Sequence, residues 1–327
     1  MSVAAAGLSL LAIALLGPVS YLLPRARWAA AEPRATLILW QAVGLSAGLA
    51  ALGAVAAAAV APLHPTLFGG LRRLLDQLLA GQPTGGLDPL HTTLLAVAVV
   101  LGTRLFGTLA LSTWRTVRAR GRHRRLVDLI GRPLTAELAS RTAERDGSAG
   151  YPTAALAADA DDGLVLDHPR PAAYCLPGGT PRVVLTSGAL ALFDDEELAA
   201  VLAHEHAHLT ERHDLVVLPF AAWSAALPWL PTVRACRGAV DRLIEMVADD
   251  RACAHCDRAV LACALARFGG AGAPAGALAA TGGGQLSVRI GRLLDPPVRS
   301  RALRVVLLAL AAALLVMPTL SLLLAAL

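Results

Sequence analysis

Residues 194–209 read DDEELAAVLAHEHAHL, and this stretch decides how the middle of the chain is expected to fold. Asp194 is followed three residues later by Glu197, a capping-box pattern that predicts the start of a helix. Behind it, apolar residues recur at helical spacing, namely Leu198, Val201, Leu202 and Leu209. The same helix then carries the pattern H-E-x-x-H over residues 204–208.

The histidines of this pattern are typical of a metal site. His204 and His208 are four residues apart, so one helix face presents both imidazoles, and both can bind one Zn²⁺ at about 2.0–2.1 Å. Glu205 would lie beside the ion, where it can act as a general base towards a zinc-activated water. A His-rich helix end can also be merely solvated, and we interpret His206 in this way. His213 is a candidate auxiliary group that contacts substrate or stabilises developing charge.

A second motif supplies the ligand that the first one lacks, because catalytic zinc sites use three protein ligands and a water. Residues 245–249 read EMVAD on an expected helix, so Glu245 and Asp249 share a face. We expect Glu245 to be the third ligand and Asp249 to hold the free ring nitrogen of a ligating histidine. The prediction is one Zn²⁺ per chain. The alternative is an ordinary charged helix face, with the neighbouring Asp241, Asp250 and Arg251.

The composition points to a membrane protein. The 327-residue chain is 56% apolar and 16% charged, whereas soluble domains average about 45–50% and about 25%. This disfavours an ordinary cytosolic enzyme, a disordered tail and a nucleic-acid module. Four apolar stretches have the roughly 20 residues that a membrane-spanning helix needs, namely Val3–Leu23, Ala35–Ala61, Leu90–Leu111 and Val305–Leu324. The first could be a cleaved signal peptide, but it lacks a positively charged start, so we expect a retained span.

The arginines predict the orientation. All 29 basic residues are Arg, and the net charge is +5. They gather after the first span, after the third and before the last, which predicts an outside N-terminus and a cytosolic middle region. We interpret the dense run Arg115–Arg125 as a membrane-flanking anchor rather than a nucleic-acid site. The chain is therefore expected to be a multi-pass cell-membrane protein, with three transmembrane helices in 1–112, a cytosolic domain in 113–304 and a transmembrane helix in 305–327.

Arg104 and the stretch Leu215–Val233 depart from the simple pattern of apolar spans. Arg104 lies inside the third span and is costly in lipid, so it is expected to face a partner helix or a wet cavity. Leu215–Val233 is apolar enough to span, but a single crossing would separate Glu245 from His204 and His208. Its prolines and tryptophans agree with a re-entrant, interfacial or bundle-packed segment. We therefore expect residues 215–233 to be a non-spanning part of the cytosolic domain.

The rest of the middle region predicts a small α+β domain. Three short strands are expected, namely Leu164–Leu166, Ala173–Leu176 and Arg182–Thr186, the last two as a hairpin. Gly269–Gly284 is typical of a linker.

The C-x-x-C pattern of Cys253 and Cys256 could begin a structural zinc site, but such sites need four ligands. Free buried thiols in a reducing cytosol are the expected interpretation.

The succession LPGG at 176–179, VVLTSG at 183–188, DEELAAVLAHE at 195–205 and EMVAD at 245–249 resembles the integral-membrane gluzincins. It is most similar to the BlaR/MecR-type antirepressor metallopeptidases, with HtpX-like membrane peptidases as cousins. The resemblance implies a mainly α integral membrane protein with a cytosolic, zincin-like α+β metallopeptidase domain. It also implies the same metal ligands, His204, His208 and Glu245, with Glu205 as the general base.

The resemblance further implies how a substrate binds. In the family the strand before the active-site helix pairs with an extended peptide. This assigns a substrate edge to Tyr174, Cys175, Leu176 and Pro177. Some members cleave a winged-helix transcriptional repressor after an outside signal. Sensor-bearing members carry an extracellular domain after the last span, whereas three residues follow Leu324 here, so β-lactam sensing is not expected.

The expected function is a membrane-bound zinc endopeptidase that hydrolyses peptide bonds in a cytosolic protein, for which a repressor is one candidate. Its expected partners are that protein and the lipid bilayer, without direct nucleic-acid contact. The alternatives are a non-catalytic zinc-stabilised receptor, an HtpX-like quality-control protease, and a transporter built around Arg104 and His91. The complete set of ligands and base favours the enzyme, because a structural zinc has no use for Glu205.

Overall fold

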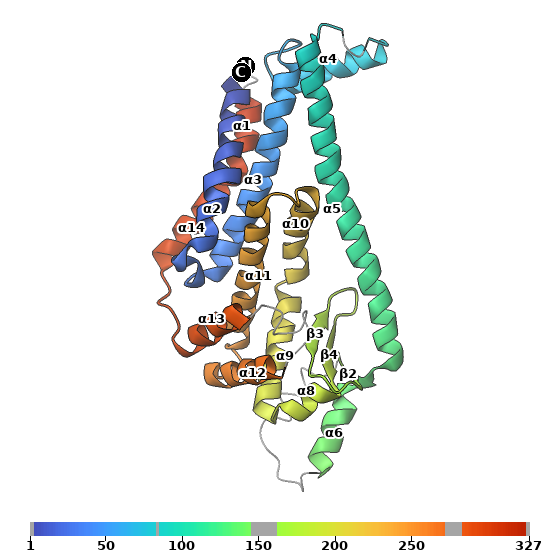
Figure 1. Cartoon of the computed structure of the whole chain (residues 1–327), viewed down its shortest axis with the longest axis vertical. Helices are drawn as coiled ribbons and strands as arrows, with labels where there is room; N and C mark the ends of the chain where they lie inside the picture. The colour runs from blue at the N-terminus through green and yellow to red at the C-terminus, as the bar shows by residue number, and fades with distance from the viewer. Residues whose placement is uncertain (1–2, 83–84, 145–161, 272–282, 325–327) are drawn as a thin grey trace. The chain divides into compact units, whose positions relative to one another are not determined.

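The computed structural model describes residues 3–82, 85–144, 162–271 and 283–324, and it is mainly helical with one small sheet (Figure 1). The chain divides into two compact units. The first comprises residues 1–113, 217–240 and 300–327, and the second comprises residues 114–216 and 241–299.

The first unit is built from apolar helices. It holds α1 (Val3–Ala14), α2 (Ser20–Leu22), α3 (Pro33–Val60), α4 (Leu67–Leu79) and α14 (Arg301–Leu324), with parts of α5 (Pro89–Ile130), α10 (His213–Ala226) and α11 (Pro231–Ala252). Among the described residues, four helical segments are long and apolar enough to cross a membrane, namely Ala5–Arg25, Pro33–Val60, Pro89–Ile130 and Arg301–Leu320. They coincide with the four predicted spans. The helix of the third one continues through the arginine run to Ile130.

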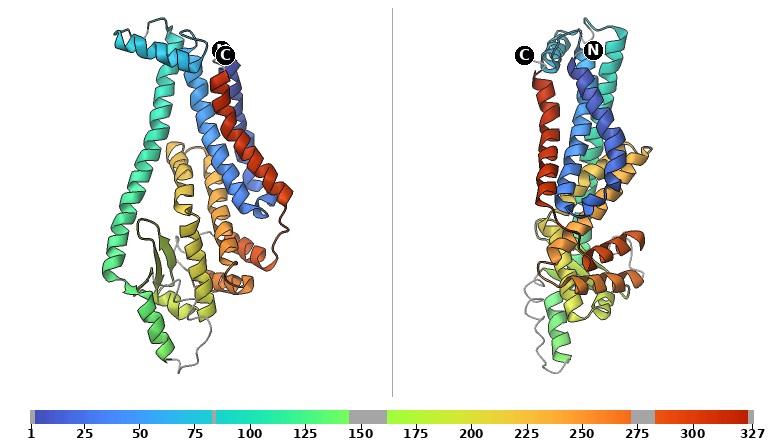
Figure 2. Two further views of the ribbon diagram at one scale, coloured as in Figure 1. Left: turned by 180° about the vertical axis from the view of Figure 1, so that it is seen from behind. Right: turned by 90° about the vertical axis from the view of Figure 1, so that its left-hand side faces the viewer.

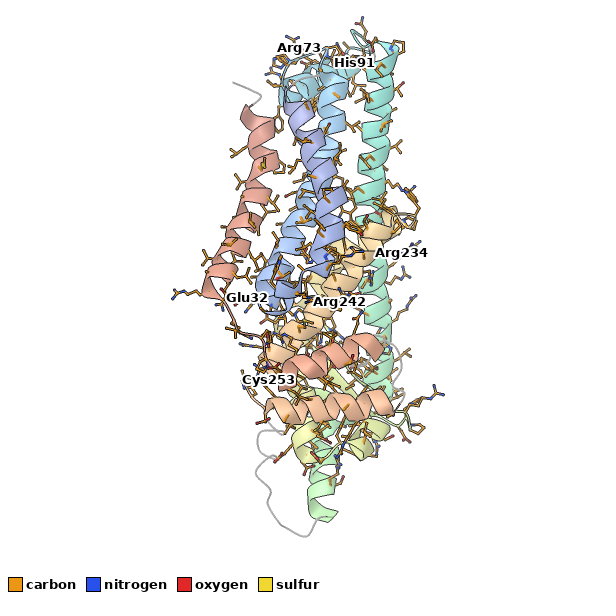
Figure 3. The ribbon with its side chains drawn as sticks, turned by 60° about the vertical axis from the view of Figure 1, so that its left-hand side comes forward. Glu32, Arg73, His91, Arg234, Arg242 and Cys253 are labelled. Atoms are coloured by element: carbon orange, nitrogen blue, oxygen red, sulfur yellow. The ribbon has the colours of Figure 1, made fainter. Side chains whose placement is uncertain are left out.

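Helices α1 and α14 both pack against α3, as the two views in Figure 2 show. Its buried face is rich in small residues that allow close helix approach, including Ala47, Gly48, Ala50 and Ala54. Ser46 Oγ donates a hydrogen bond to the carbonyl of Leu314 at 2.6 Å. Glu32, labelled in Figure 3 just before α3, pairs with Arg304 Nε at 3.0 Å. Polar contacts therefore tie α14 to α3 at two levels.

Arg104 in α5 has a partner helix. Its Nε donates to the carbonyl of Ala226 at 2.8 Å, and its guanidinium lies 5.0 Å from the ring centre of Trp229. The last carbonyls of a helix lack partners inside the helix, so Arg104 satisfies one at the end of α10. Of the two environments considered for this residue, the structure shows contact with another helix.

The ambiguous apolar stretch 215–233 is a helical hairpin. It forms most of α10, a turn at 227–230 and the start of α11. Residues 217–240 group with the apolar helices of the first unit, while both sequence motifs, at 204–208 and 245–249, fall in the second. That the stretch does not span the membrane stays a prediction.

The second unit contains the sheet. Its elements are the end of α5, β1 (Arg132–Pro133), α6 (Leu134–Glu144), β2 (Gly163–Leu166), β3 (Ala173–Leu176), β4 (Arg182–Thr186), α8 (Ser187–Leu192), α9 (Asp195–Thr210), the start of α10, the end of α11, α12 (Arg258–Gly270) and α13 (Gly283–Leu294). The strand order is β1-β2-β4-β3, with β2 and β4 parallel and the other pairs antiparallel. The predicted β3–β4 hairpin is thus confirmed, with β3 at an edge. Of the predicted linker, residues 272–282 lie outside the described residues, and its ends belong to α12 and α13.

Helix α9 is fixed at its start and along one face. The predicted capping box is present: the Glu197 amide donates to Asp194 Oδ1 at 2.9 Å, and the Asp194 amide donates to Glu197 Oε2 at 3.2 Å. Leu198 and Leu202 are fully buried in a core shared with the sheet and α12. In the same core the rings of Phe193 and Phe268 stack at 5.6 Å. This packing holds α9 in place while the face with H-E-x-x-H meets α11.

Candidate metal centre

Three side chains from two helices meet in the second unit. His204 and His208 come from α9 and Glu245 from α11, and one nitrogen or oxygen atom of each lies within 4.8 Å of the others. The two Nε2 atoms are 3.1 Å apart. Glu245 Oε2 is 3.5 Å from Nε2 of His204, and Glu245 Oε1 is 3.7 Å from Nε2 of His208.

These separations fit a tetrahedral metal ion. Ligand atoms at about 2.0–2.1 Å from such an ion are about 3.3 Å apart, and the three measured distances lie around this value. Two imidazole nitrogens and a carboxylate are also the ligand types of catalytic zinc sites. Residues His204, His208 and Glu245 can therefore hold Zn²⁺ with one coordination position left for water or substrate.

Asp249 lies against the other side of the His204 ring. The distance from His204 Nδ1 to Asp249 Oδ1 is 3.0 Å, and both side chains are only 1% exposed. A carboxylate at Nδ1 leaves Nε2 as the free lone pair, which is the tautomer a metal needs. Burial disfavours a proton on His204, but hydrogen bonds to Asp249 and Glu245 outweigh it and raise its pKa to about 9. Metal binding at this ring therefore releases a proton.

The other two members of the cluster are in the forms that bind metals. Burial, helped by the charge on His204, lowers the pKa of His208 to about 3, so this ring is neutral. Burial alone would protonate Glu245, but the hydrogen bond with His204 and the charge of Arg289 lower its pKa to about 2. A neutral imidazole and an ionised carboxylate are the required ligand states.

Glu205 is buried next to the cluster without belonging to it. Burial, together with the charge of Glu245, raises its pKa to about 7 against the opposing charge of His204. A general base works best when its pKa lies near the working pH. Glu205 is therefore suited to take up and return a proton at neutral pH.

His213, the first residue of α10, contacts the second histidine of the motif. Its Nδ1 is 3.0 Å from Nδ1 of His208, and the two rings meet edge to face with centres 4.8 Å apart. His213 is 4% exposed. This contact is suited to orienting the His208 ring. The auxiliary role predicted for His213, contact with substrate or stabilisation of developing charge, stays a prediction. His206 instead faces Leu202, with its Nδ1 3.0 Å from that carbonyl.

We expect the substitution His213→Ala to weaken zinc binding about 10-fold, because residues that orient metal ligands typically contribute 10–100-fold to affinity. His206→Ala, on α9 between the two histidines of the motif, is the control and should leave the affinity unchanged. Competition with a chromophoric chelator measures both constants. Equal affinities for the two variants would show that His213 does not orient His208.

The predicted substrate edge is an edge strand. Along an antiparallel pair of strands, hydrogen-bonded residue pairs alternate with pairs that are not hydrogen-bonded. Thr186 N–H donates to the carbonyl of Ala172 at 3.0 Å. Cys175 lies three residues further along, so its backbone N–H and C=O point away from β4. The Pro177 carbonyl, just beyond β3, accepts a hydrogen bond from Arg124 at 2.5 Å. Arg124 therefore already occupies one end of this edge.

Successive side chains of β3 face opposite sides of the sheet. Tyr174 and Leu176 pack on the α5 side with Val127, and the Tyr174 hydroxyl is 3.0 Å from His123 Nε2. Cys175 lies on the other side of the sheet, close enough to Glu205 for its pKa to be affected by that carboxylate. Burial raises the pKa of the Cys175 thiol, so it stays protonated.

Two arginines that carry no motif also belong to this region. Arg289 in α13 is 2% exposed and pairs with Asp249 and Glu245. Arg292, one turn further on, pairs with Asp250. A buried arginine needs an acidic partner. Arg289 lies 40 residues after Asp249 in the sequence, and no local sequence pattern predicts contacts over such a separation. Cys253 and Cys256 follow the end of α11 (Cys253 is labelled in Figure 3), and both are free thiols, as predicted, but half-buried rather than buried.

Two histidines and one glutamate that converge on one point, with a buried glutamate beside them, are typical of a metallopeptidase site. Residues 152–242 of the chain match the model of peptidase family M48. Peptidases of this family are typically zinc-dependent. The match includes both histidines and Glu205, and it ends before Glu245 and Asp249. No curated protein and no solved structure matches the chain.

The similarity of residues 152–242 to peptidase family M48, the His-His-Glu cluster and the four apolar helices together support a membrane-associated metallopeptidase. The narrower resemblance to the BlaR/MecR-type antirepressors stays a prediction. So does the assignment of individual residues as ligands, base and substrate edge.

Proposed function

We propose that the chain is a membrane-bound zinc endopeptidase that hydrolyses peptide bonds in a cytosolic protein. The observation that carries the proposal is the convergence of His204, His208 and Glu245 around one point, with Glu205 buried beside it. A structural zinc would use four protein ligands, whereas this cluster offers three and adds a carboxylate suited to acid–base work.

The chain's own residues divide the reaction between them. A zinc ion held by His204, His208 and Glu245 would lower the pKa of water towards ~7 and polarise the scissile carbonyl. Glu205 accepts a proton from the attacking water and then donates it to the leaving amine. Asp249 and His213 hold the two imidazoles in orientation. The free edge of β3 at Cys175 aligns an extended segment of the substrate by backbone hydrogen bonds.

The side of the membrane and the class of substrate are inferred from the sequence. The arginine distribution favours a cytosolic site, so the substrate would be a cytosolic protein. A winged-helix repressor is the substrate that the antirepressor resemblance favours. HtpX-like cleavage of damaged membrane proteins is the alternative that the same chemistry allows.

Metal removal tests the proposal. The purified full-length chain, in detergent, is expected to cleave an unfolded protein such as casein and to lose this activity on treatment with a chelator. One equivalent of Zn²⁺ per chain should restore it, because the cluster found among the described residues has the ligands for one ion. Mass spectrometry of the products should show internal cleavage. Hydrolysis that continues after complete zinc removal would contradict the proposal.

Substrates are identified in cells. Newly formed protein N-termini are compared between cells that carry the wild type and cells that carry Glu205→Ala at matched levels. Termini seen only with the wild type mark substrates. A DNA-binding repressor among them would support the antirepressor role, whereas termini from membrane proteins would support quality control.

A further inference from the structure

Arg289 is a buried cation at the back of the candidate metal centre. It lies on α13, and it is 2% exposed. Its Nε donates to Asp249 Oδ2 at 2.9 Å and its Nη2 to Asp249 Oδ1 at 2.6 Å. Its Nη1 is 2.8 Å from Glu245 Oε2. One guanidinium thus contacts two carboxylates that belong to the same face of α11.

These contacts link Arg289 to two members of the His-His-Glu cluster. It touches Glu245 directly. It reaches His204 through Asp249, because Asp249 Oδ1 accepts from Arg289 and also lies 3.0 Å from Nδ1 of His204. We propose that Arg289 is a positioning residue of the metal centre, which fixes the Glu245 carboxylate and, through Asp249, the His204 ring in the arrangement that binds the ion. The inference rests on the proposed zinc site.

The shape of the guanidinium matters for this role. Its planar fork presents several N–H groups in fixed directions and can bind one carboxylate with two of them. Here two N–H groups hold Asp249 and a third direction remains for Glu245. A lysine has one charged nitrogen without this fixed geometry. Arg289→Lys therefore keeps the positive charge but loses the orientation.

The charge of Arg289 and its positioning role predict opposite changes in zinc affinity when the residue is replaced. A positive charge close to the site repels a cation, so if charge were the whole effect, removing it would strengthen zinc binding. If Arg289 positions the ligands, removing it weakens zinc binding, because Glu245 and Asp249 lose their common partner. The sign of the change in affinity thus separates the two roles.

Arg292 provides a matched control on the same helix. It is also buried, and its Nη1 and Nη2 donate to the two oxygens of Asp250 at 2.9 and 2.7 Å. Asp250 also pairs with Arg299 at 2.8 Å. This second arginine ties α13 to α11 through the residue next to Asp249. If the contact between α13 and α11 were all that mattered, variants of Arg292 and of Arg289 should therefore lose zinc affinity alike.

The experiment measures zinc affinity on the purified full-length chain by competition with a chromophoric chelator. We expect Arg289→Met to weaken binding about 10–100-fold, with Arg289→Lys between it and the wild type. Arg292→Met should stay within about 3-fold of the wild type, since sites without shared ligands act independently. As a second readout, the visible absorption of bound Co²⁺, which reports ligand geometry, should change in both Arg289 variants and not in Arg292→Met.

The opposite results overturn the inference. Unchanged or tighter zinc binding in Arg289→Met would assign the residue to charge balance, and an equal loss in Arg292→Met would assign it to helix packing. If Arg289→Met does not fold, Arg289→Lys decides the question by the same readouts. Zinc affinity is measured without hydrolysis, so an Arg289-dependent zinc site without peptidase activity would contradict only the proposed function. Hydrolysis that depends on Glu205, with zinc affinity indifferent to Arg289, would contradict only the inference.

Discussion

Replacement of Glu205 by glutamine is expected to lower kcat for peptide hydrolysis about 10²–10⁴-fold, the usual contribution of a general acid–base group. Glutamine has the same size and can fill the buried position on α9, but its amide cannot accept the proton of the attacking water. Because Glu205 lies beside the His-His-Glu cluster rather than in it, zinc should remain bound with nearly the wild-type affinity. Hydrolysis of casein and zinc content per chain are the two measurements.

Glu196→Gln is the control for this substitution. Glu196 lies on the same helix, nine residues earlier, and it is exposed. It should keep wild-type kcat, which shows that removing a carboxylate from α9 does not by itself disturb the reaction. If Glu205→Gln retained full activity, another group would have to act as the base. If it lost zinc as well as activity, Glu205 would serve the metal site rather than the proton transfer.

The parts of the fold that the sequence predicted correctly depend on local rules. The capping box at Asp194 and the 3.6-residue period placed α9 and the shared face of His204 and His208. The apolar lengths placed the four candidate spans. The hairpin of β3 and β4 followed from a short turn between two strands. Each of these features needs only neighbours within a few residues.

The remaining features depend on long-range packing. The parallel pairing of β2 with β4 makes β3 an edge strand, and nothing in the strand sequences distinguishes this order from others. Hydropathy could not show that residues 215–233 form two helices, because a turn between apolar helices is itself apolar here. Arg289 reaches Asp249 because α12 packs against α9 and α13 packs against α12, which brings α13 back to the end of α11. Such a contact has no signal in a single sequence.

The substitution with the largest expected effect on the metal is Glu245→Gln. Glu245 is the only member of the cluster outside α9 and the only carboxylate in it. An amide is a much weaker zinc ligand than a carboxylate, so zinc affinity should fall by more than the roughly 100-fold that indirect contacts contribute. When zinc is limiting, the rate of hydrolysis should fall in proportion to the fraction of the chain that has zinc bound. Chelator competition measures the affinity, and the zinc dependence of casein cleavage measures the activity.

Asp250→Asn is the control, because Asp250 follows on the same helix and pairs with Arg292 and Arg299. It removes a charge from α11 without removing a cluster member, so zinc affinity should be unchanged. Wild-type affinity in Glu245→Gln would mean that a different carboxylate completes the site. Asp249 is the nearest candidate by its contact with His204, and Asp249→Asn would then have to show the loss expected of Glu245. A loss confined to Glu245→Gln instead makes α11 the second half of the metal centre, which α9 alone cannot form.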